Sequence, residues 1–227
     1  MRRLVRGAAV ALAMSACIGS SSPDAGQVLR DGAAAMARLT TVSAVLKVTK
    51  GTISIQGFSL VSAKTAVRLP SDSDTVYTVK EKDVTIGLEV VISAAHVYLH
   101  VPFSPFQEVK GTQAAAFPDM AKLFDPTTGL PAVIPAGAKP QYVSTDQVDG
   151  KNTYQVSTSY TPDQIRGLLS QLNSNGPVGA RVWVDTSTHV IRKAVLTGAF
   201  GDNGADATVE VDITGFDKPV VITSPSP

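Results

Sequence analysis

Residues 41–51 of the chain read TVSAVLKVTKG, and along this stretch apolar residues recur at every second position. Successive side chains of a β-strand point to opposite faces, so this alternation predicts a strand with one buried face. Three further stretches repeat the pattern: VSAKTAVRL at 61–69, VTIGLEVVI at 84–92 and HVYLHV at 96–101. The first half of the chain is therefore predicted to form consecutive strands of an antiparallel sheet.

The second half adds a hairpin, a helix and three more strands. Strands predicted at 141–148 and 151–159 flank Asp149-Gly150, a pair that suits a type I′ turn. The segment TPDQIRGLLSQLNSNG at 161–176 is predicted to be a helix, because Thr161 and Gln164 can form a capping box. The last strands are predicted at 178–185, 189–200 and 206–214.

Two other segments are predicted to be helical. Residues 22–40 have Ser22 as a candidate cap and Pro23 in the first turn. Residues 112–139 are rich in Pro and Ala, and they predict one or two short helices joined by irregular chain. The expected fold class is α+β: a single curved antiparallel β-sheet with helices on one face.

The N-terminal stretch MRRLVRGAAVALAMSAC predicts an exported protein. Residues 1–16 have the basic and apolar regions of a signal peptide. Met14-Ser15-Ala16-Cys17 resembles a bacterial lipobox, in which Cys17, the only cysteine, is acylated; a plain signal peptide would leave a free thiol instead. We expect residues 17–23 to be an acylated tether, 24–221 one domain and 222–227 a disordered tail. The expected location is the extracytoplasmic face of the cell membrane, with a lipid anchor.

Charge and motifs exclude several function classes. Loss of residues 1–16 would leave seventeen basic and nineteen acidic side chains, a net charge of −2. A nearly neutral domain has no electrostatic footprint for nucleic acid. His96 and His100 share a strand face about 13 Å apart, too far to share a metal ion. No motif of nucleophile, base or metal ligands is present, so we expect no enzyme activity, no cofactor and no metal.

The alternating strands present an apolar face that is aliphatic rather than aromatic. Either this face packs as a solid core, or a gap under the helices admits acyl chains; periodicity alone fits both. For the second case the candidate cavity residues are Leu46, Val48, Val67, Ile86, Leu88, Val90, Val97, Leu99, Val182 and Val184. Trp183 falls on the opposite strand face, where we favour a packing role over ligand contact.

Three stretches carry a resemblance to a known family. They are LFDPTTGL at 123–130, VDGKNTYQVS at 148–157, and RVWVDTSTHVIRKAVLTG at 181–198 together with ITGFDKPVVITSP at 213–225. They resemble the LppX/LprA/LprF/LprG family of mycobacterial and actinobacterial lipoproteins. The resemblance implies a LolA/LolB-like half-barrel whose concave face is covered by helices. Pro131 and Pro135 depart from the family pattern and predict a shortened helix after the DPTTGL stretch.

The resemblance also implies a function. Family members hold multi-acyl lipids or lipoglycans in an apolar cavity and help to move them across the envelope without catalysis, and relatives suggest a membrane lipid transporter as a partner. The first hypothesis is therefore a membrane-anchored carrier of such lipids. The second is a surface lipoprotein with a solid core that acts as a protein-binding sensory or adhesion module, which would present an exposed apolar patch.

Overall fold

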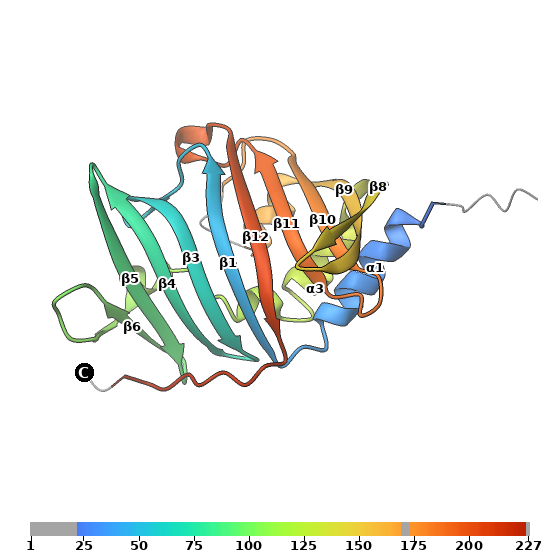
Figure 1. Ribbon diagram of the computed structural model, residues 1–227. Helices are drawn as coiled ribbons and strands as arrows, with labels where there is room; N and C mark the ends of the chain where they lie inside the picture. Colours follow the sequence, from blue (N-terminus) through green and yellow to red (C-terminus); the bar gives the residue numbers. More distant parts are fainter. Residues whose placement is uncertain (1–21, 169–172, 226–227) are drawn as a thin grey trace, which may run out of the picture.

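The computed structural model describes residues 22–168 and 173–225, and its main element is a 12-stranded antiparallel sheet. The sheet order is β7-β6-β5-β4-β3-β1-β12-β11-β10-β9-β8, with β2 paired to β3 (Figure 1). The strands are β1 (Thr41–Lys50), β2 (Ser54–Ile55), β3 (Phe58–Arg68), β4 (Asp72–Glu81), β5 (Val84–Ser93), β6 (His96–His100), β7 (Gln107–Val109), β8 (Ala138–Val148), β9 (Lys151–Tyr160), β10 (Val178–Asp185), β11 (Ile191–Gly198) and β12 (Ala207–Phe216).

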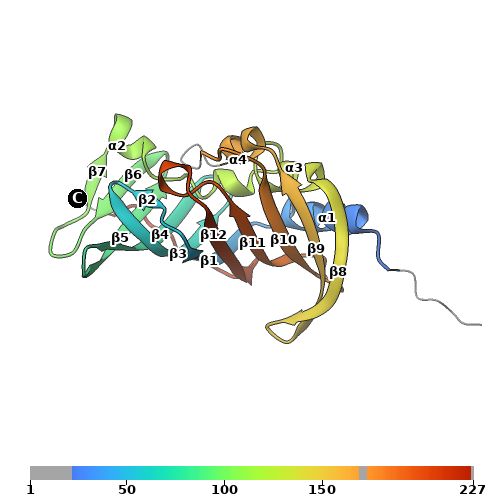
Figure 2. The ribbon, with the colours of Figure 1, turned by 90° about the horizontal axis from the view of Figure 1, so that it is seen from above.

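The helices lie on one side of this sheet. They are α1 (Ala25–Met36), α2 (Gly111–Ala115), η1 (Lys122–Phe124), α3 (Leu130–Val133), η2 (Ile134–Ala136), α4 (Pro162–Leu168) and η3 (Asp202–Gly204). Figure 2 shows that both edges of the sheet bend toward the side that carries α1, α2, α3 and α4, so this is the concave face. The predicted fold class, a curved antiparallel sheet with helices over its concave face, is confirmed.

In the centre of the sheet, the side of the strands that was predicted to face inward is the side that is buried. In β1, Val42 and Ala44 are buried while Ser43 and Val45 are only half-buried. Strand β1 pairs with β3 on one side and with β12 on the other, so the first and last strands are neighbours. Side chains of the same phase on these three strands form one apolar surface beneath the helices.

Helix α1 begins later than the sequence suggested. Asp24, rather than Ser22, is the N-cap: its Oδ1 accepts a hydrogen bond from the Gln27 N–H at 2.8 Å. A carboxylate is a strong acceptor at the positive end of a helix, which explains this choice of cap. Leu29 and Met36 are buried in the core beneath the helix.

The turn and cap signals in the second half form as predicted. Asp149 and Gly150 both have positive φ, 50° and 71°, as a type I′ turn requires. At α4 the Thr161 N–H donates to Gln164 Oε1 at 2.8 Å, and the Gln164 N–H donates to Thr161 Oγ1 at 3.3 Å. The predicted continuation of this helix at residues 169–172 lies outside the described residues.

The segment between β7 and β8 forms short helical pieces, as predicted. Pro131 lies in the first turn of α3 and Pro135 lies in η2, and each of these elements has only four or three residues. A proline donates no backbone hydrogen bond, so neither piece extends into a longer helix. Residues 117–136, which contain η1, α3 and η2, form together with α4 what we call the roof, residues 117–136 and 162–168.

The C-terminal segment is ordered further than predicted. Ile222, which we assigned to a disordered tail, is only 4% exposed, and its carbonyl accepts a hydrogen bond from Arg68 Nη2 at 3.2 Å. Figure 1 shows the segment running along the lower ends of β3, β4 and β5. Asp217 fixes its start by accepting hydrogen bonds from the Thr40 N–H at 2.7 Å and the Thr40 hydroxyl at 2.8 Å.

Candidate functional site

An apolar cavity of about 180 Å³ lies between the centre of the sheet and the roof. All of its lining side chains except Ser54, Thr65 and Tyr77 are apolar. The lining residues are Ala44, Leu46, Ile53, Ser54, Ile55, Leu60, Ala63, Thr65, Tyr77, Pro118, Met120, Leu123, Phe124, Leu130, Ile165, Leu168, Val178, Leu196, Phe200, Val209, Val211 and Ile213. Among the residues that the structure describes, no charged group lines it, so the cavity suits hydrocarbon rather than an ion.

Space remains above the floor of the cavity because small side chains lie on the central strands. Ala63 on β3 is paired with Leu46 on β1 and with Tyr77 on β4. Ala44 is paired with Ile213 on β12. Protein interiors are close-packed, so an alanine among larger neighbours leaves space unless another side chain reaches into it.

The LFDPTTGL stretch forms a tight turn in the roof. Asp125 Oδ1 accepts hydrogen bonds from the N–H groups of Thr127 and Thr128 at 2.9 and 2.8 Å, and from both of their hydroxyls. These bonds lower the pKa of Asp125 to about 2. Gly129 follows, and a Cβ there would lie 2.5 Å from the Leu123 carbonyl oxygen. The tight turn therefore requires glycine, and it directs Leu123 and Phe124 into the cavity.

The polar side chains of the cavity wall are Ser54 on β2, Thr65 on β3 and Tyr77 on β4. The hydroxyls of Thr65 and Thr75 hydrogen-bond each other at 2.8 Å. Tyr77 is 2% exposed, and within the described part of the chain its hydroxyl has no hydrogen-bond partner. Burial raises the pKa of this phenol, so it stays neutral.

A second hollow of about 540 Å³ adjoins the cavity, and Leu168 lines both. Its apolar wall comes from β5, β6 and α2, and its charged residues are Asp119, Lys122 and Arg166. Lys122 Nζ lies 3.4 Å from Asp119 Oδ2, and Arg166 Nη1 lies 2.8 Å from Asp163 Oδ1. The hollow thus combines an apolar wall with two cationic groups at the edge of the roof.

The ten candidate cavity residues all lie on the concave face, but only Leu46 lines the enclosed cavity. Val67, Val182 and Val184 are buried in the core cluster that also contains the apolar side chains of α1. A second cluster toward β5 and β6, which Val48 also borders, holds Ile86, Leu88, Val90, Val97 and Leu99. Among them Val97 also lines the second hollow. Cys17 lies outside the described residues.

Sequence reasoning missed the lining residues of the C-terminal strands and the small residues of the floor. Leu196, Val209, Val211 and Ile213 come to the cavity because β12 pairs with β1, a pairing between the two ends of the chain. The sequence predicted strands at 189–200 and 206–214, but it assigned no inward positions there and did not show that β12 pairs with β1.

The histidines hold no common site. His96 Nδ1 lies 2.7 Å from Glu108 Oε1, and His100 Nδ1 lies 3.4 Å from Glu89 Oε2. Within residues 22–168 and 173–225, no group of three or more His, Cys, Asp or Glu could hold a metal ion. No helix in these ranges is long and apolar enough to span a bilayer.

The fold and the site together define a half-barrel protein with an apolar cavity under a helical roof. The particular family is shown by its sequence model, which matches residues 24–222: the chain belongs to the LppX_LprAFG lipoprotein family. The chain is 27% identical to the lipoarabinomannan carrier protein LprG of Mycobacterium tuberculosis H37Rv over 237 residues, covering 99% of this chain and 95% of the relative.

Two solved structures share the fold. The crystal structure of LprF from Mycobacterium bovis matches with a TM-score of 0.73 at 20% identity, covering 91% of this chain and all of that one. The crystal structure of the Mycobacterium tuberculosis lipoprotein LppX matches with a TM-score of 0.66 at 16% identity, covering 89% of this chain and all of that one. The predicted family membership is confirmed.

Proposed function

We propose that this protein is a membrane-anchored, non-enzymatic carrier that shields the acyl chains of a lipid or lipoglycan during transfer across the cell envelope. The observation that carries the proposal is the apolar cavity between sheet and roof. The relative LprG is named a lipoarabinomannan carrier, which supports the same class of cargo for this chain. A solid core, as expected for the alternative protein-binding module, would have no such cavity.

The size of the cavity sets how much lipid the closed form can shield. With about 30 Å³ for each methylene, close to the volume of a water molecule, 180 Å³ holds about six methylene groups. A lipid with three long chains has on the order of 50 methylenes, and at ~0.8 kcal/mol each their exposure costs roughly 40 kcal/mol. We therefore propose that loading requires the roof to move away from the sheet.

The bonding of the roof suits such a movement. Among the described residues, every hydrogen bond of 117–133 that we find joins residues within 114–134. Next to it, Ile134 accepts one bond from Tyr160 Oη at 3.1 Å, and Ala136 accepts one from Gln164 Nε2 at 3.2 Å. The remaining attachment is apolar contact, which an entering acyl chain replaces with similar contact.

The second hollow is our candidate for the polar end of the cargo. It adjoins the cavity at Leu168, and its Lys122 and Arg166 can pair with phosphate or carboxylate. In this arrangement acyl chains enter beneath the roof while the head group stays at the edge, in water.

We further propose that Cys17 is acylated and that residues 17–23 tether the domain to the extracytoplasmic face of the cell membrane. One acyl chain gives only marginal binding, whereas two or more hold a protein stably. A membrane lipid transporter that delivers cargo to the roof is the partner this arrangement calls for.

The test is to purify the full-length protein from membranes of an actinobacterial host and to analyse extracted lipid by mass spectrometry. We expect a stoichiometric multi-acyl lipid, and we expect the protein to accelerate transfer of that lipid between donor and acceptor vesicles. An empty protein that leaves the transfer rate unchanged would overturn the proposal in favour of the protein-binding alternative.

A further inference from the structure

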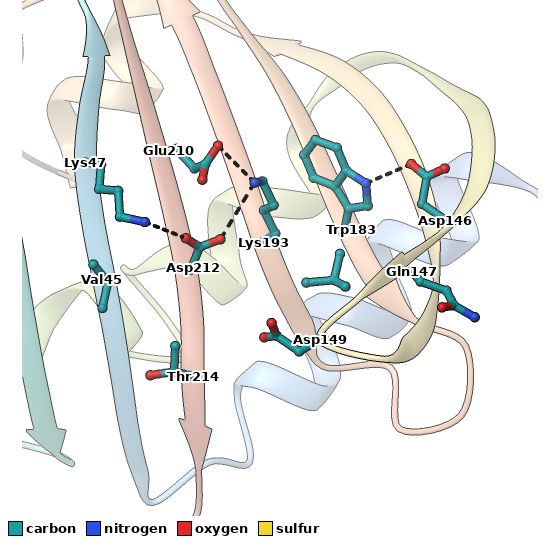
Figure 3. Close-up of a pocket in the computed structure, with 11 residues that line it drawn as sticks. Val45, Lys47, Asp146, Gln147, Asp149, Trp183, Lys193, Glu210, Asp212 and Thr214 are labelled. Atoms are coloured by element: carbon teal, nitrogen blue, oxygen red, sulfur yellow. Dashed lines mark hydrogen bonds and ion pairs between the residues drawn. The ribbon is translucent and has the colours of Figure 1, made fainter.

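A hollow of about 590 Å³ lies on the opposite, convex face of the sheet (Figure 3). Strands β1, β12, β11 and β10 form its floor. Residues 146–149 of the β8–β9 hairpin form one side, and Figure 2 shows the tip of this hairpin extending past the sheet, away from the helices. The lining residues are Val45, Lys47, Asp146, Gln147, Val148, Asp149, Trp183, Lys193, Glu210, Asp212 and Thr214.

Trp183 lines this hollow next to the hairpin and is the only tryptophan of the chain. It is half-buried, and its Nε1–H donates a hydrogen bond to Asp146 Oδ2 at 3.0 Å. That bond ties the indole to the hairpin and fixes the orientation of the ring. Figure 3 shows the ring broadside, with its flat face turned outward from the sheet. Beyond the packing we expected of it, the residue offers a fixed aromatic platform.

Fixed polar groups surround this platform, and the nearest, Lys193 Nζ, lies over the Trp183 ring at 5.8 Å from its centroid. Trp183, Lys193 and Asp212 occupy directly paired positions on three neighbouring strands. Lys193 Nζ lies 2.9 Å from Glu210 Oε2 and 3.8 Å from Asp212 Oδ1. The side chains of Lys193, Glu210 and Asp212 are only 24%, 26% and 27% exposed, so they are held in place rather than extended into water.

The charge of the hollow limits the class of ligand. Four carboxylates and two ammonium groups line it, which gives a net charge of −2 and disfavours anionic ligands. The carboxylate oxygens keep lone pairs beyond those used by the lysines, so they can accept hydrogen bonds from hydroxyl groups. A flat apolar platform surrounded by fixed acceptors matches a sugar ring, which has an apolar C–H face and hydroxyls at its rim.

We propose that this convex hollow is a binding site for a neutral carbohydrate, with the sugar ring stacked on Trp183 and its hydroxyls bonded to Asp212, Glu210 and Asp146. The site goes beyond the proposed carrier function, because it shares no residue with the cavity under the roof. The carbohydrate can be a free glycan of the envelope or the glycan part of a lipoglycan, and both present the same chemistry.

The only tryptophan makes the binding directly observable. The full-length protein, in a polyoxyethylene detergent that contains no sugar, is titrated with neutral maltotriose, mannotriose and xylotriose while tryptophan emission is recorded. We expect at least one of them to change the emission saturably. A trisaccharide that carries uronic acid groups should bind at least tenfold more weakly than its neutral counterpart.

Variants assign the binding to the hollow. Thr214 is exposed at its edge, so Thr214→Arg should fill the hollow without touching the core and weaken binding at least tenfold by calorimetry. Thr208→Arg, on the same strand face outside the hollow, is the matched control and should bind normally. Trp183→Ala should abolish binding, with an unfolding curve recorded to show that the fold survives.

The cavity variant Ala63→Leu separates the two sites, because it should impair fatty-acid binding and leave trisaccharide binding unchanged. Deacylated lipoglycan, added as a competitor, separates the two sources: it displaces the trisaccharide if the hollow binds the glycan part of a lipoglycan and leaves it bound if the hollow binds only free glycan. No saturable signal with any neutral sugar, or equal binding by the Thr214→Arg and Thr208→Arg variants, would overturn the carbohydrate site and leave the carrier proposal unaffected. Binding of a protein to the hollow without any sugar binding would likewise overturn it.

Discussion

Ala63→Leu tests the cavity by predicting two effects of opposite sign. The leucine adds three carbon atoms above the middle of the floor, beside Leu46 and Tyr77. Three acyl methylenes displaced at ~0.8 kcal/mol each amount to about 2.4 kcal/mol, which is roughly a 50-fold weaker affinity for a fatty acid. The same three carbons, now buried in the protein, should raise the free energy of unfolding by about 1–2 kcal/mol.

The assay uses displacement of the fluorescent fatty acid cis-parinaric acid from delipidated protein, together with urea unfolding. Ala66→Leu is the matched control, because Ala66 lies on the same strand with its side chain on the convex face, paired with Ser43 and Asp74. We expect the control to bind the fatty acid as the unmodified protein does. A more stable Ala63→Leu protein with unchanged affinity would refute the reasoning, because it would show that acyl chains bind elsewhere.

Three further predictions concern the walls of the site and the sheet. Tyr77→Phe should raise the free energy of unfolding in urea by about 1 kcal/mol, because it removes a buried hydroxyl that has no partner among the described residues; a loss of stability would contradict this. Gly129→Ala should cost about 1–3 kcal/mol by clashing with three carbonyls of the roof, whereas Gly87→Ala, with open space around it, should be nearly neutral in the same assay. Asp185→Ala should cost about 3–5 kcal/mol by leaving Arg192 unpaired. Burial opposes the charge of Asp185, but its hydrogen bonds outweigh this and lower its pKa, so its contribution is complete above about pH 4 and is lost in acid. Between pH 7 and pH 3 the melting temperature of Asp185→Ala should therefore fall less steeply than that of the unmodified protein. Equal slopes would count against this account.

Much of the fold could be predicted because its local signals agree with its final packing. The alternation in 41–51, the Asp149-Gly150 turn and the Thr161 capping box each decide a local conformation by themselves. The cap of α1 was predicted wrongly at Ser22, because Asp24 two residues later is the better acceptor and the sequence offers both.

The candidate site was harder to predict because a cavity is a property of many distant residues at once. The rule that inward aliphatic residues line a cavity selected Val67, Val90 and Val184, which are packed tightly instead. The gap lies above Ala44 and Ala63, where side chains are too short to meet the roof. Burial periodicity identifies the inward face, but only the pairing of β1 with β12 shows which small residues come together.

The pairing of the first strand with the last has a consequence for folding during the export that we propose. Val42 is paired with Phe216, so the middle of the sheet cannot assemble until residue 216 has emerged. Contacts across such a separation form slowly, since a long loop must close first. A chain that crosses a membrane with its N-terminus first would therefore lack the β1–β12 pairing until translocation is nearly finished. Completion of secretion, rather than the appearance of any one segment, would trigger the final collapse.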